Sequence, residues 1–92
     1  MDFFVYLVEC GNKTYYCGWT TNPEARVKAH NKGTASKYTR ARLPVKLVYI
    51  EKQKNKGAAL RREAKIKSLS RKQKQALVNS FAAKASQSQF FS

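Results

Sequence analysis

The stretch FFVYLVEC, residues 3–10, constrains the fold of this chain more than any other feature. Apolar, aromatic and β-branched residues follow one another here almost without a break, which is typical of a central strand with both faces covered. Such a strand needs other strands beside it and helices against it. Because 92 residues fit one domain and no more, we expect a two-layer arrangement of a few strands and helices.

A β-hairpin is predicted from this strand onward. The next residues, GNK at 11–13, have turn chemistry, and TYYCGWT at 14–20 again has strand composition. With a three-residue loop, Cys10 pairs with Thr14, and one face of the sheet carries Tyr6, Val8, Tyr16 and Gly18. With a two-residue loop, Tyr6 and Tyr16 lie on opposite faces instead.

The two cysteines point to neither a disulfide nor a zinc site. The three-residue register puts Cys17 on the face away from Cys10, so no bond is expected between them. One histidine and two cysteines do not make a zinc-binding pattern. Residues 1–8 lack a basic region and a cleavage site, and no apolar run is long enough to span a membrane, so the expected location is the cytoplasm.

Helices and a third strand fill the rest of the chain. Asn22 is a good N-cap before Pro23, which predicts a helix to about residue 31. Residues 32–44 are expected to form a basic loop with room for a helical turn, residues 45–51 a strand, and residues 58–69 a helix. Ser70 and Gln73 form a capping box that begins a third helix. The domain is predicted to cover residues 1–80, followed by a frayed tail, residues 81–92, with Phe90 and Phe91 able to fold back.

Charge points to a polyanionic partner. Nineteen Lys and Arg oppose five Asp and Glu, and the net charge of +14 is uneven: −1 over residues 1–21, +6 over 22–50 and +9 over 51–92. A small domain with this excess repels itself unless a polyanion relieves the charge, and nucleic acid is the first candidate. The alternatives are a solvated basic face kept for solubility and, less favoured, an anionic membrane surface.

Glu63 is the first candidate for chemistry. On a helical wheel it lies in the middle of an apolar face formed by Ala59, Leu60 and Ile66. A carboxylate that faces a sheet is costly unless it is paired or binds a cation. Either it forms an ion pair with a nearby Arg, or it is a metal ligand, since one carboxylate suffices for Mg²⁺ when water and phosphate complete the shell.

Arg26 and His30 share a helix face because they are four residues apart. The guanidinium suits phosphate, and the imidazole suits a general base or a phosphate contact. The alternative is that both lie on a solvated face. For Tyr6 and Tyr16 the alternative is core packing, although Gly18 in a strand favours close approach by a backbone or ligand.

These residues, in this order, resemble the GIY-YIG nuclease superfamily. Phe4-Val5-Tyr6 corresponds to the first motif and Tyr16-Cys17-Gly18 to the second, with Phe4 in place of Gly and Cys17 in place of Ile. Arg26 follows ten residues after Tyr16, and the helix LRREAKIKSL carries Glu63. The stretch KYTRARLPVKLVY is similar to that of small, stand-alone bacterial members. The resemblance covers about residues 3–78 and implies an α/β fold of the α+β type, a three-stranded antiparallel sheet flanked by about three helices.

The resemblance also implies a metal-dependent endonuclease. Glu63 would hold one Mg²⁺ or Mn²⁺ against the scissile phosphate, Arg26 would stabilise the transition state, and a proton would pass to Tyr6, Tyr16 or, through water, His30. The basic loop would contact the nucleic-acid backbone or stack on a base through Lys37, Tyr38, Arg40 and Arg42. The expected substrate is DNA, branched, nicked or single-stranded, with DNA repair as one setting and RNA left open. The alternatives are a non-catalytic binding module on the same fold and a ribosome-associated basic protein.

Overall fold

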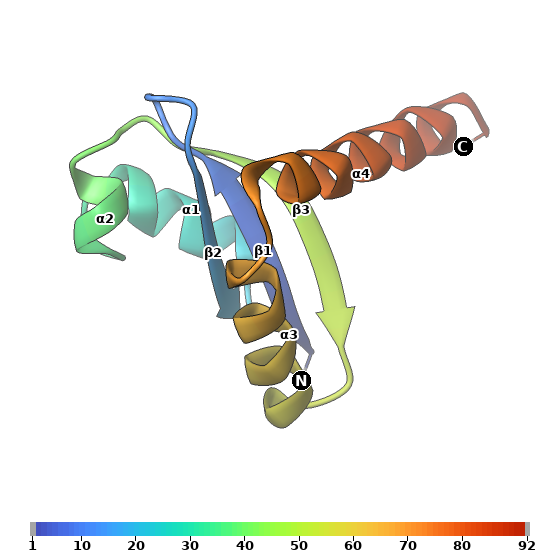
Figure 1. Ribbon diagram of the computed structural model, residues 1–92, viewed down its shortest axis with the longest axis horizontal. Helices are drawn as coiled ribbons and strands as arrows, with labels where there is room; N and C mark the ends of the chain where they lie inside the picture. The colour runs from blue at the N-terminus through green and yellow to red at the C-terminus, as the bar shows by residue number, and fades with distance from the viewer. Residues whose placement is uncertain (1, 92) are drawn as a thin grey trace.

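The computed structural model describes the backbone of residues 2–91 and the side chains of residues 2–84. Its elements follow in the order β1 (Phe3–Glu9), β2 (Tyr15–Thr20), α1 (Pro23–Asn31), α2 (Lys37–Arg40), β3 (Lys46–Gln53), α3 (Lys56–Lys67) and α4 (Arg71–Phe91) (Figure 1). The strands form one antiparallel sheet in the order β2-β1-β3. The expected three-stranded antiparallel sheet flanked by helices is therefore confirmed, with β1 at its centre.

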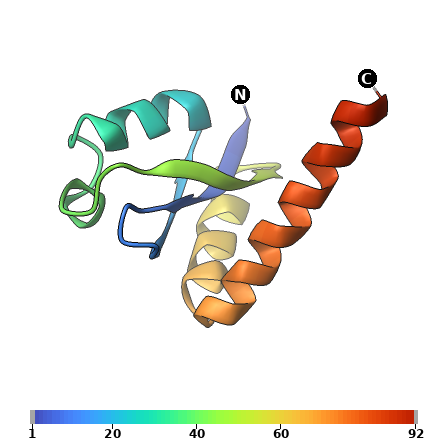
Figure 2. The same cartoon turned by 90° about the horizontal axis from the view of Figure 1, so that it is seen from above.

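Helices cover both faces of the sheet, which explains the unbroken apolar run of β1. Figure 2 shows the sheet between α1 on one side and the pair α3 and α4 on the other. Val5 and Leu7 pack with Ile66 of α3 on one face, whereas Tyr6 and Val8 pack with residues of α1 on the other. Since both kinds of position are buried, an alternating pattern would have left polar groups in the core.

The hairpin has the three-residue register. Tyr6 lies opposite Gly18, and Val8 lies opposite Tyr16, so the two tyrosines share a face. The backbone N–H of Cys10 donates to the carbonyl of Thr14 at 2.8 Å, and the loop closes with Lys13 in the left-handed region at a φ of 71°. Cys10 and Cys17 are free and belong to opposite sides of the sheet, as expected.

Two helix starts follow the capping rules. The Asn22 side chain accepts from the backbone N–H of Ala25 at 3.1 Å and begins α1. The backbone N–H of Ser70 donates to the Gln73 side chain at 2.9 Å, and the Gln73 N–H donates to the Ser70 hydroxyl at 3.2 Å. This reciprocal pair begins α4 at the predicted residue, Arg71.

Other boundaries differ from the prediction. Helix α3 begins at Lys56 rather than residue 58, because the Asn55 side chain accepts from the backbone of Ala58 at 2.8 Å and caps it earlier. Helix α2 occupies the expected basic loop, since Ser36 caps the backbone N–H groups of residues 38 and 39. Helix α4 continues to Phe91, past residue 81, because no Gly or Pro interrupts it. The expectation for the side chains of Phe90 and Phe91 lies outside the described side chains, and the division at residue 80 stays a prediction.

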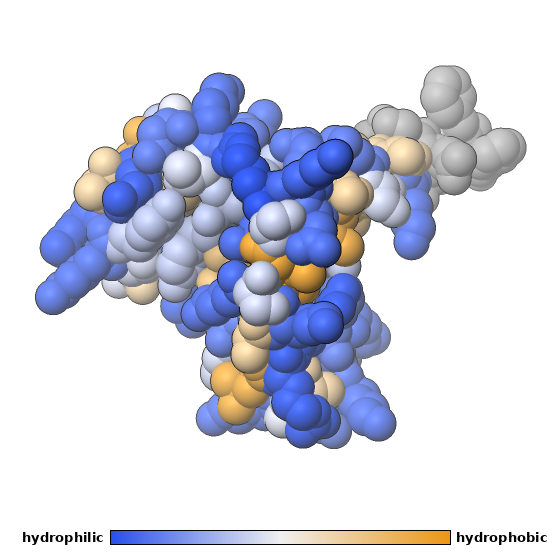
Figure 3. All heavy atoms as spheres, in the orientation of Figure 1, coloured by the Kyte–Doolittle hydropathy of each residue, from blue (hydrophilic) through white to orange (hydrophobic). Residues whose placement is uncertain are grey.

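Hydrophilic atoms cover most of the face drawn in Figure 3. Hydrophobic groups gather over the start of α4 and near the N-terminal end of α3. Within the part of the chain that the structure describes, no helix is both long and apolar enough to cross a membrane.

Candidate active site

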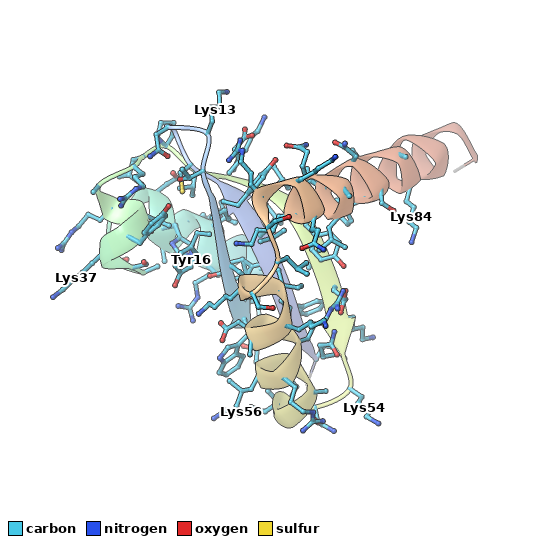
Figure 4. All side chains as sticks on the ribbon, viewed as in Figure 1. Lys13, Tyr16, Lys37, Lys54, Lys56 and Lys84 are labelled. Atoms are coloured by element: carbon cyan, nitrogen blue, oxygen red, sulfur yellow. The ribbon has the colours of Figure 1, made fainter. Side chains whose placement is uncertain are left out.

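The five candidate catalytic residues come from four elements. Tyr6 lies on β1 and Tyr16 on β2, Arg26 and His30 lie on α1, and Glu63 lies on α3. Figure 4 shows Tyr16 beside β2, between α2 and α3. The structure brings Tyr6, Tyr16 and His30 into direct contact. Arg26 and Glu63 lie close enough to act electrostatically on the Tyr6 hydroxyl. The site therefore lies at the β2 edge of the sheet.

Tyr6 and His30 form the buried centre of the site. The Tyr6 hydroxyl lies 2.8 Å from His30 Nε2, and the exposed fractions of the two residues are 2% and 1%. A solvated helix face for His30 was one of the alternatives, and this burial shows it to be wrong. Gly18 makes room for the tyrosine, because a Cβ at that position would lie 2.5 Å from the Tyr6 hydroxyl. The close approach expected at Gly18 is therefore made by the Tyr6 side chain of the protein itself.

Thr39 completes the buried set and was not among the predicted residues. Its exposed fraction is 0%, and its Oγ1 lies 2.8 Å from His30 Nδ1. Both ring nitrogens of His30 are therefore engaged, one by β1 and the other by α2. Nothing in the sequence singles out this threonine, because a polar residue among Lys and Arg has the pattern of a solvent-exposed loop.

An aromatic stack joins the site to the basic segment of α2. The Tyr16 ring contacts the His30 ring edge-on at 5.3 Å between centroids and stacks on Tyr38 at 5.8 Å with an interplanar angle of 26°. The Arg42 guanidinium lies 3.8 Å from the centroid of the Tyr38 ring and donates to the Tyr38 carbonyl at 2.8 Å. Tyr38 keeps 38% of its surface exposed, and Lys37 and Arg40 are exposed. The four residues predicted to contact nucleic acid therefore all lie within residues 37–42, and Tyr38 connects this segment to Tyr16.

Burial and charge set the protonation of the buried pair. Burial raises the pKa of Tyr6, and the neighbouring Tyr16 adds to this, whereas Arg26 acts in the opposite direction. Burial lowers the pKa of His30, and the positive charge of Arg26 lowers it further. Near neutral pH the pair is thus a neutral phenol and a neutral imidazole, and the imidazole is the stronger base of the two.

Arg26 is half-buried and carries a guanidinium that no carboxylate neutralises within the described side chains. Two of the acidic side chains pair with other cations: Glu51 with Arg62 at 2.7 Å, and Glu63 with Lys67 at 3.8 Å. An unpaired guanidinium beside a buried tyrosine and histidine is suited to an anionic ligand.

Glu63 lies at the border of the buried face of α3, not in its middle. Ala59 and Ile66 are fully buried, but Leu60 is 43% exposed, so its place on the expected apolar face was wrong. The buried face of α3 is narrower than predicted, because only Ala59 and Ile66, which are seven residues apart, point directly at the sheet. The Glu63 side chain keeps 18% of its surface exposed, and its nearest cation is Lys67 at 3.8 Å rather than an Arg. Its carboxylate thus stays available to a ligand.

Cys17 links Glu63 to the sheet. Its Sγ lies 3.9 Å from the backbone carbonyl of Glu63, which ties β2 to the turn of α3 that carries the carboxylate. Burial, followed by the charge of Glu63, raises the pKa of the thiol to about 12. Cys17 therefore stays protonated and serves as a packing group rather than a nucleophile.

Comparison with known proteins identifies the family. The profile described as the GIY-YIG catalytic domain matches residues 2–76. The chain belongs to the GIY-YIG family. The matched span contains every site residue discussed above, from Tyr6 to Glu63, and ends within the first two turns of α4.

Small GIY-YIG relatives are similar over most of their length. A UPF0213 protein from Natronomonas pharaonis is 51% identical over 77 residues, which cover 84% of this chain and 91% of the relative. One from Clostridium perfringens is 52% identical over 77 residues, 84% of this chain and 83% of that one. Among solved structures, an Enterococcus faecalis protein has a TM-score of 0.60 at 36% identity, covering 90% and 88% of the chains. A UPF0213 protein from Bacillus halodurans has a TM-score of 0.55 at 40% identity, covering 86% and 84%.

Proposed function

We propose that this chain is a metal-dependent endonuclease that hydrolyses phosphodiester bonds in DNA. The observation that carries the proposal is the buried hydrogen bond of 2.8 Å between Tyr6 and His30, beside the unpaired Arg26. A domain that only binds a polyanion needs lysines and arginines on its surface. It has no use for a neutral phenol and imidazole buried together, which cost desolvation without adding charge.

The Tyr6–His30 pair accepts the proton of the attacking water. As the water oxygen bonds to phosphorus, its proton passes to the Tyr6 oxygen while the phenolic proton passes to His30 Nε2. The lowered pKa of His30 keeps the imidazole neutral before the step, so one ring nitrogen is unprotonated and can receive the proton. Tyr16, which contacts the same imidazole through its ring, is the competing acceptor.

Arg26 stabilises the charge that develops on the phosphoryl group. A guanidinium offers two parallel N–H donors to two oxygens, and here no carboxylate competes for them among the described side chains. The same positive charge already acts on Tyr6 and His30, which supports a position next to the reacting centre.

Glu63 is the residue suited to hold Mg²⁺ or Mn²⁺. No group of three or more metal-ligating side chains occurs in the described part of the chain, so the protein would supply one carboxylate and leave the other positions to water and phosphate. Magnesium sites of this kind are common. The contact of the carboxylate with Lys67, at 3.8 Å, is weak and leaves the carboxylate free to bind a metal ion. A bound divalent ion would polarise the phosphoryl oxygen and stabilise the leaving oxygen.

DNA is held beside the cut by the segment of α2. Lys37, Arg40 and Arg42 contact phosphates. When Arg42 moves from the Tyr38 ring to a phosphate, the exposed face of that ring packs against an unpaired base. This arrangement supports branched, nicked or single-stranded DNA as the substrate, with repair as its setting. A non-catalytic binding module on the same fold is the second candidate, because the net charge of +14 would serve it equally well.

One set of assays separates the two candidates. The purified protein is incubated with plasmid, branched and single-stranded DNA, with and without Mg²⁺ or Mn²⁺, alongside Glu63→Ala and Arg26→Ala. Matched controls are Glu24→Ala and Lys28→Ala, which remove an exposed carboxylate and an exposed cation of α1. We expect cutting that requires the metal, is lost in the first two variants and persists in the controls.

The opposite outcomes are equally clear. If the wild type and Glu63→Ala bind DNA but neither cuts any substrate, the chain is a binding module. If cutting survives in Glu63→Ala, another site or a contaminant is responsible. Binding should also weaken steeply as salt rises, and binding insensitive to salt would argue against phosphate contacts.

A further inference from the structure

Three buried side chains from three separate elements form a continuous hydrogen-bonded chain. Tyr6 of β1, His30 of α1 and Thr39 of α2 are each at most 2% exposed. The two links are both 2.8 Å long, from the Tyr6 hydroxyl to His30 Nε2 and from His30 Nδ1 to Thr39 Oγ1. The last link of this hydrogen-bonded series is to the backbone carbonyl of Ser36, which accepts a hydrogen bond from the Thr39 hydroxyl at 3.3 Å.

Counting hydrogens shows which group donates in each of these hydrogen bonds. A neutral imidazole carries one N–H, and each hydroxyl carries one O–H. If the proton is on Nδ1, Tyr6 donates to Nε2, Nδ1 donates to Thr39, and Thr39 donates to Ser36, so every hydrogen has an acceptor. If the proton is on Nε2, it points at the Tyr6 oxygen, and the buried Tyr6 hydrogen has no other acceptor among the described residues. Burying that hydrogen without a partner is costly, so the first arrangement is favoured.

We propose that Thr39 is a positioning residue that holds His30 in the tautomer with its proton on Nδ1. Because its own hydrogen is committed to the carbonyl of Ser36, Thr39 presents a lone pair to His30. Nε2 is then left as the acceptor for the proton of Tyr6. This inference rests on the proposed function for its catalytic meaning, whereas the tautomer itself can be observed in a protein that cuts nothing.

The chain contains one histidine, so its imidazole can be followed directly. We would record long-range ¹⁵N–¹H correlations of the ¹⁵N-labelled protein above the pKa of His30. The wild type should show Nδ1 as a protonated nitrogen and Nε2 as an unprotonated one. The reverse assignment in the wild type would overturn the inference without any variant, so the test does not depend on a variant that folds.

Two variants at position 39 test the role of the hydroxyl. Thr39→Val keeps the shape and removes the lone pair, so Nε2 should become protonated in part or in full, whereas Thr39→Ser should keep the wild-type pattern. Thr20→Val is the matched control, because Thr20 is also buried but bonds the backbone of Asn22. An unchanged tautomer in Thr39→Val, or the same change in Thr20→Val, would contradict the inference.

Cleavage assays then separate this inference from the proposed function. Thr39→Val should lower kcat about 10- to 100-fold, part of the usual contribution of a positioned base, while the KM for DNA changes less than twofold and Thr39→Ser restores the rate. If the wild type has the expected tautomer but cuts no DNA, the endonuclease proposal fails and the positioning by Thr39 stands. If Thr39→Val loses the tautomer but cuts as fast as the wild type, the positioning has no catalytic role and the inference fails.

Discussion

Gly18→Ala is the change that tests the site geometry most directly. The new Cβ would lie 2.5 Å from the Tyr6 hydroxyl oxygen, 2.7 Å from Cζ and 3.0 Å from Cε1. Tyr6 cannot swing away freely, because it is buried between the sheet and α1 and bonded to His30. Either the tyrosine or the β2 backbone must shift. A shift of the tyrosine breaks its bond to His30, and a shift of β2 disturbs the backbone pairing with β1, so a hydrogen bond is lost in both cases.

The cost follows from two contributions. Overpacking a core position costs about 1–3 kcal/mol, and losing a net hydrogen bond costs about 0.5–1.5 kcal/mol. Together they predict a loss of about 1.5–4.5 kcal/mol in the free energy of unfolding. With a urea dependence of about 2 kcal/mol per molar, the middle of the usual range, the midpoint should fall by roughly 0.8–2.3 M. Trp19 is the only tryptophan and neighbours Gly18, so its fluorescence reports the unfolding.

Gly57→Ala provides the matched control. Its Cβ would meet the flexible end of Arg61, with Nη1 at 3.3 Å, and would lie at ordinary contact distance, 3.4 Å, from the capping oxygen of Asn55; Gly57 lies in the first turn of α3. Glycine to alanine at such a position should stabilise the protein by about 0.4–1 kcal/mol.

Besides destabilising the protein, Gly18→Ala should abolish cleavage. A stability within about 0.5 kcal/mol of the wild type, the size of a neutral surface change, would refute the close packing of Tyr6 on Gly18.

Three further outcomes are expected. Burial acts to raise the pKa of Glu51, but hydrogen bonds from a tyrosine and Arg62 outweigh it and leave the pKa below its usual value of 4.5. The resulting stability is complete above pH 4.5 and is lost as the pH falls through the folded value, so urea unfolding of Glu51→Gln should depend less on pH between 5 and 3. The Asn31 side chain bonds both the N–H and the carbonyl of Val45, at 2.8 and 3.0 Å, and Asn31→Ala should cost about 1–3 kcal/mol; an unchanged urea midpoint would contradict this. Tyr38→Ala should weaken single-stranded DNA binding about 5- to 100-fold in fluorescence anisotropy and duplex binding much less, and equal losses would argue against base stacking.

Local patterns predicted the hairpin and two of the helix starts well. The GNK turn fixed the register that puts Tyr6 opposite Gly18, and Asn22 and Ser70 begin helices where their side chains can cap them. These features depend on residues a few positions apart, so the sequence contains the information they need.

Contacts between distant segments were not predictable in the same way. Thr39 meets His30 only because α2 folds back onto α1, and the link from Asn31 to Val45 spans fourteen residues. A helical wheel places Leu60 on the apolar face of α3, but the wheel cannot show which part of that face contacts the sheet, and Leu60 is exposed. The order of the candidate residues suggested the site, and only the tertiary structure joined them.

The position of β2 at the edge of the sheet limits how copies of this protein can associate. Among the described strands, β2 pairs with β1 alone, and an edge strand offers its free backbone groups to a strand of another molecule. A second copy added there would lie beside Tyr16 and Gly18 and obstruct the approach to Tyr6. Strand-to-strand association through β2 and access of a nucleic-acid substrate to the site therefore exclude each other, and the positive charge of each copy opposes the association.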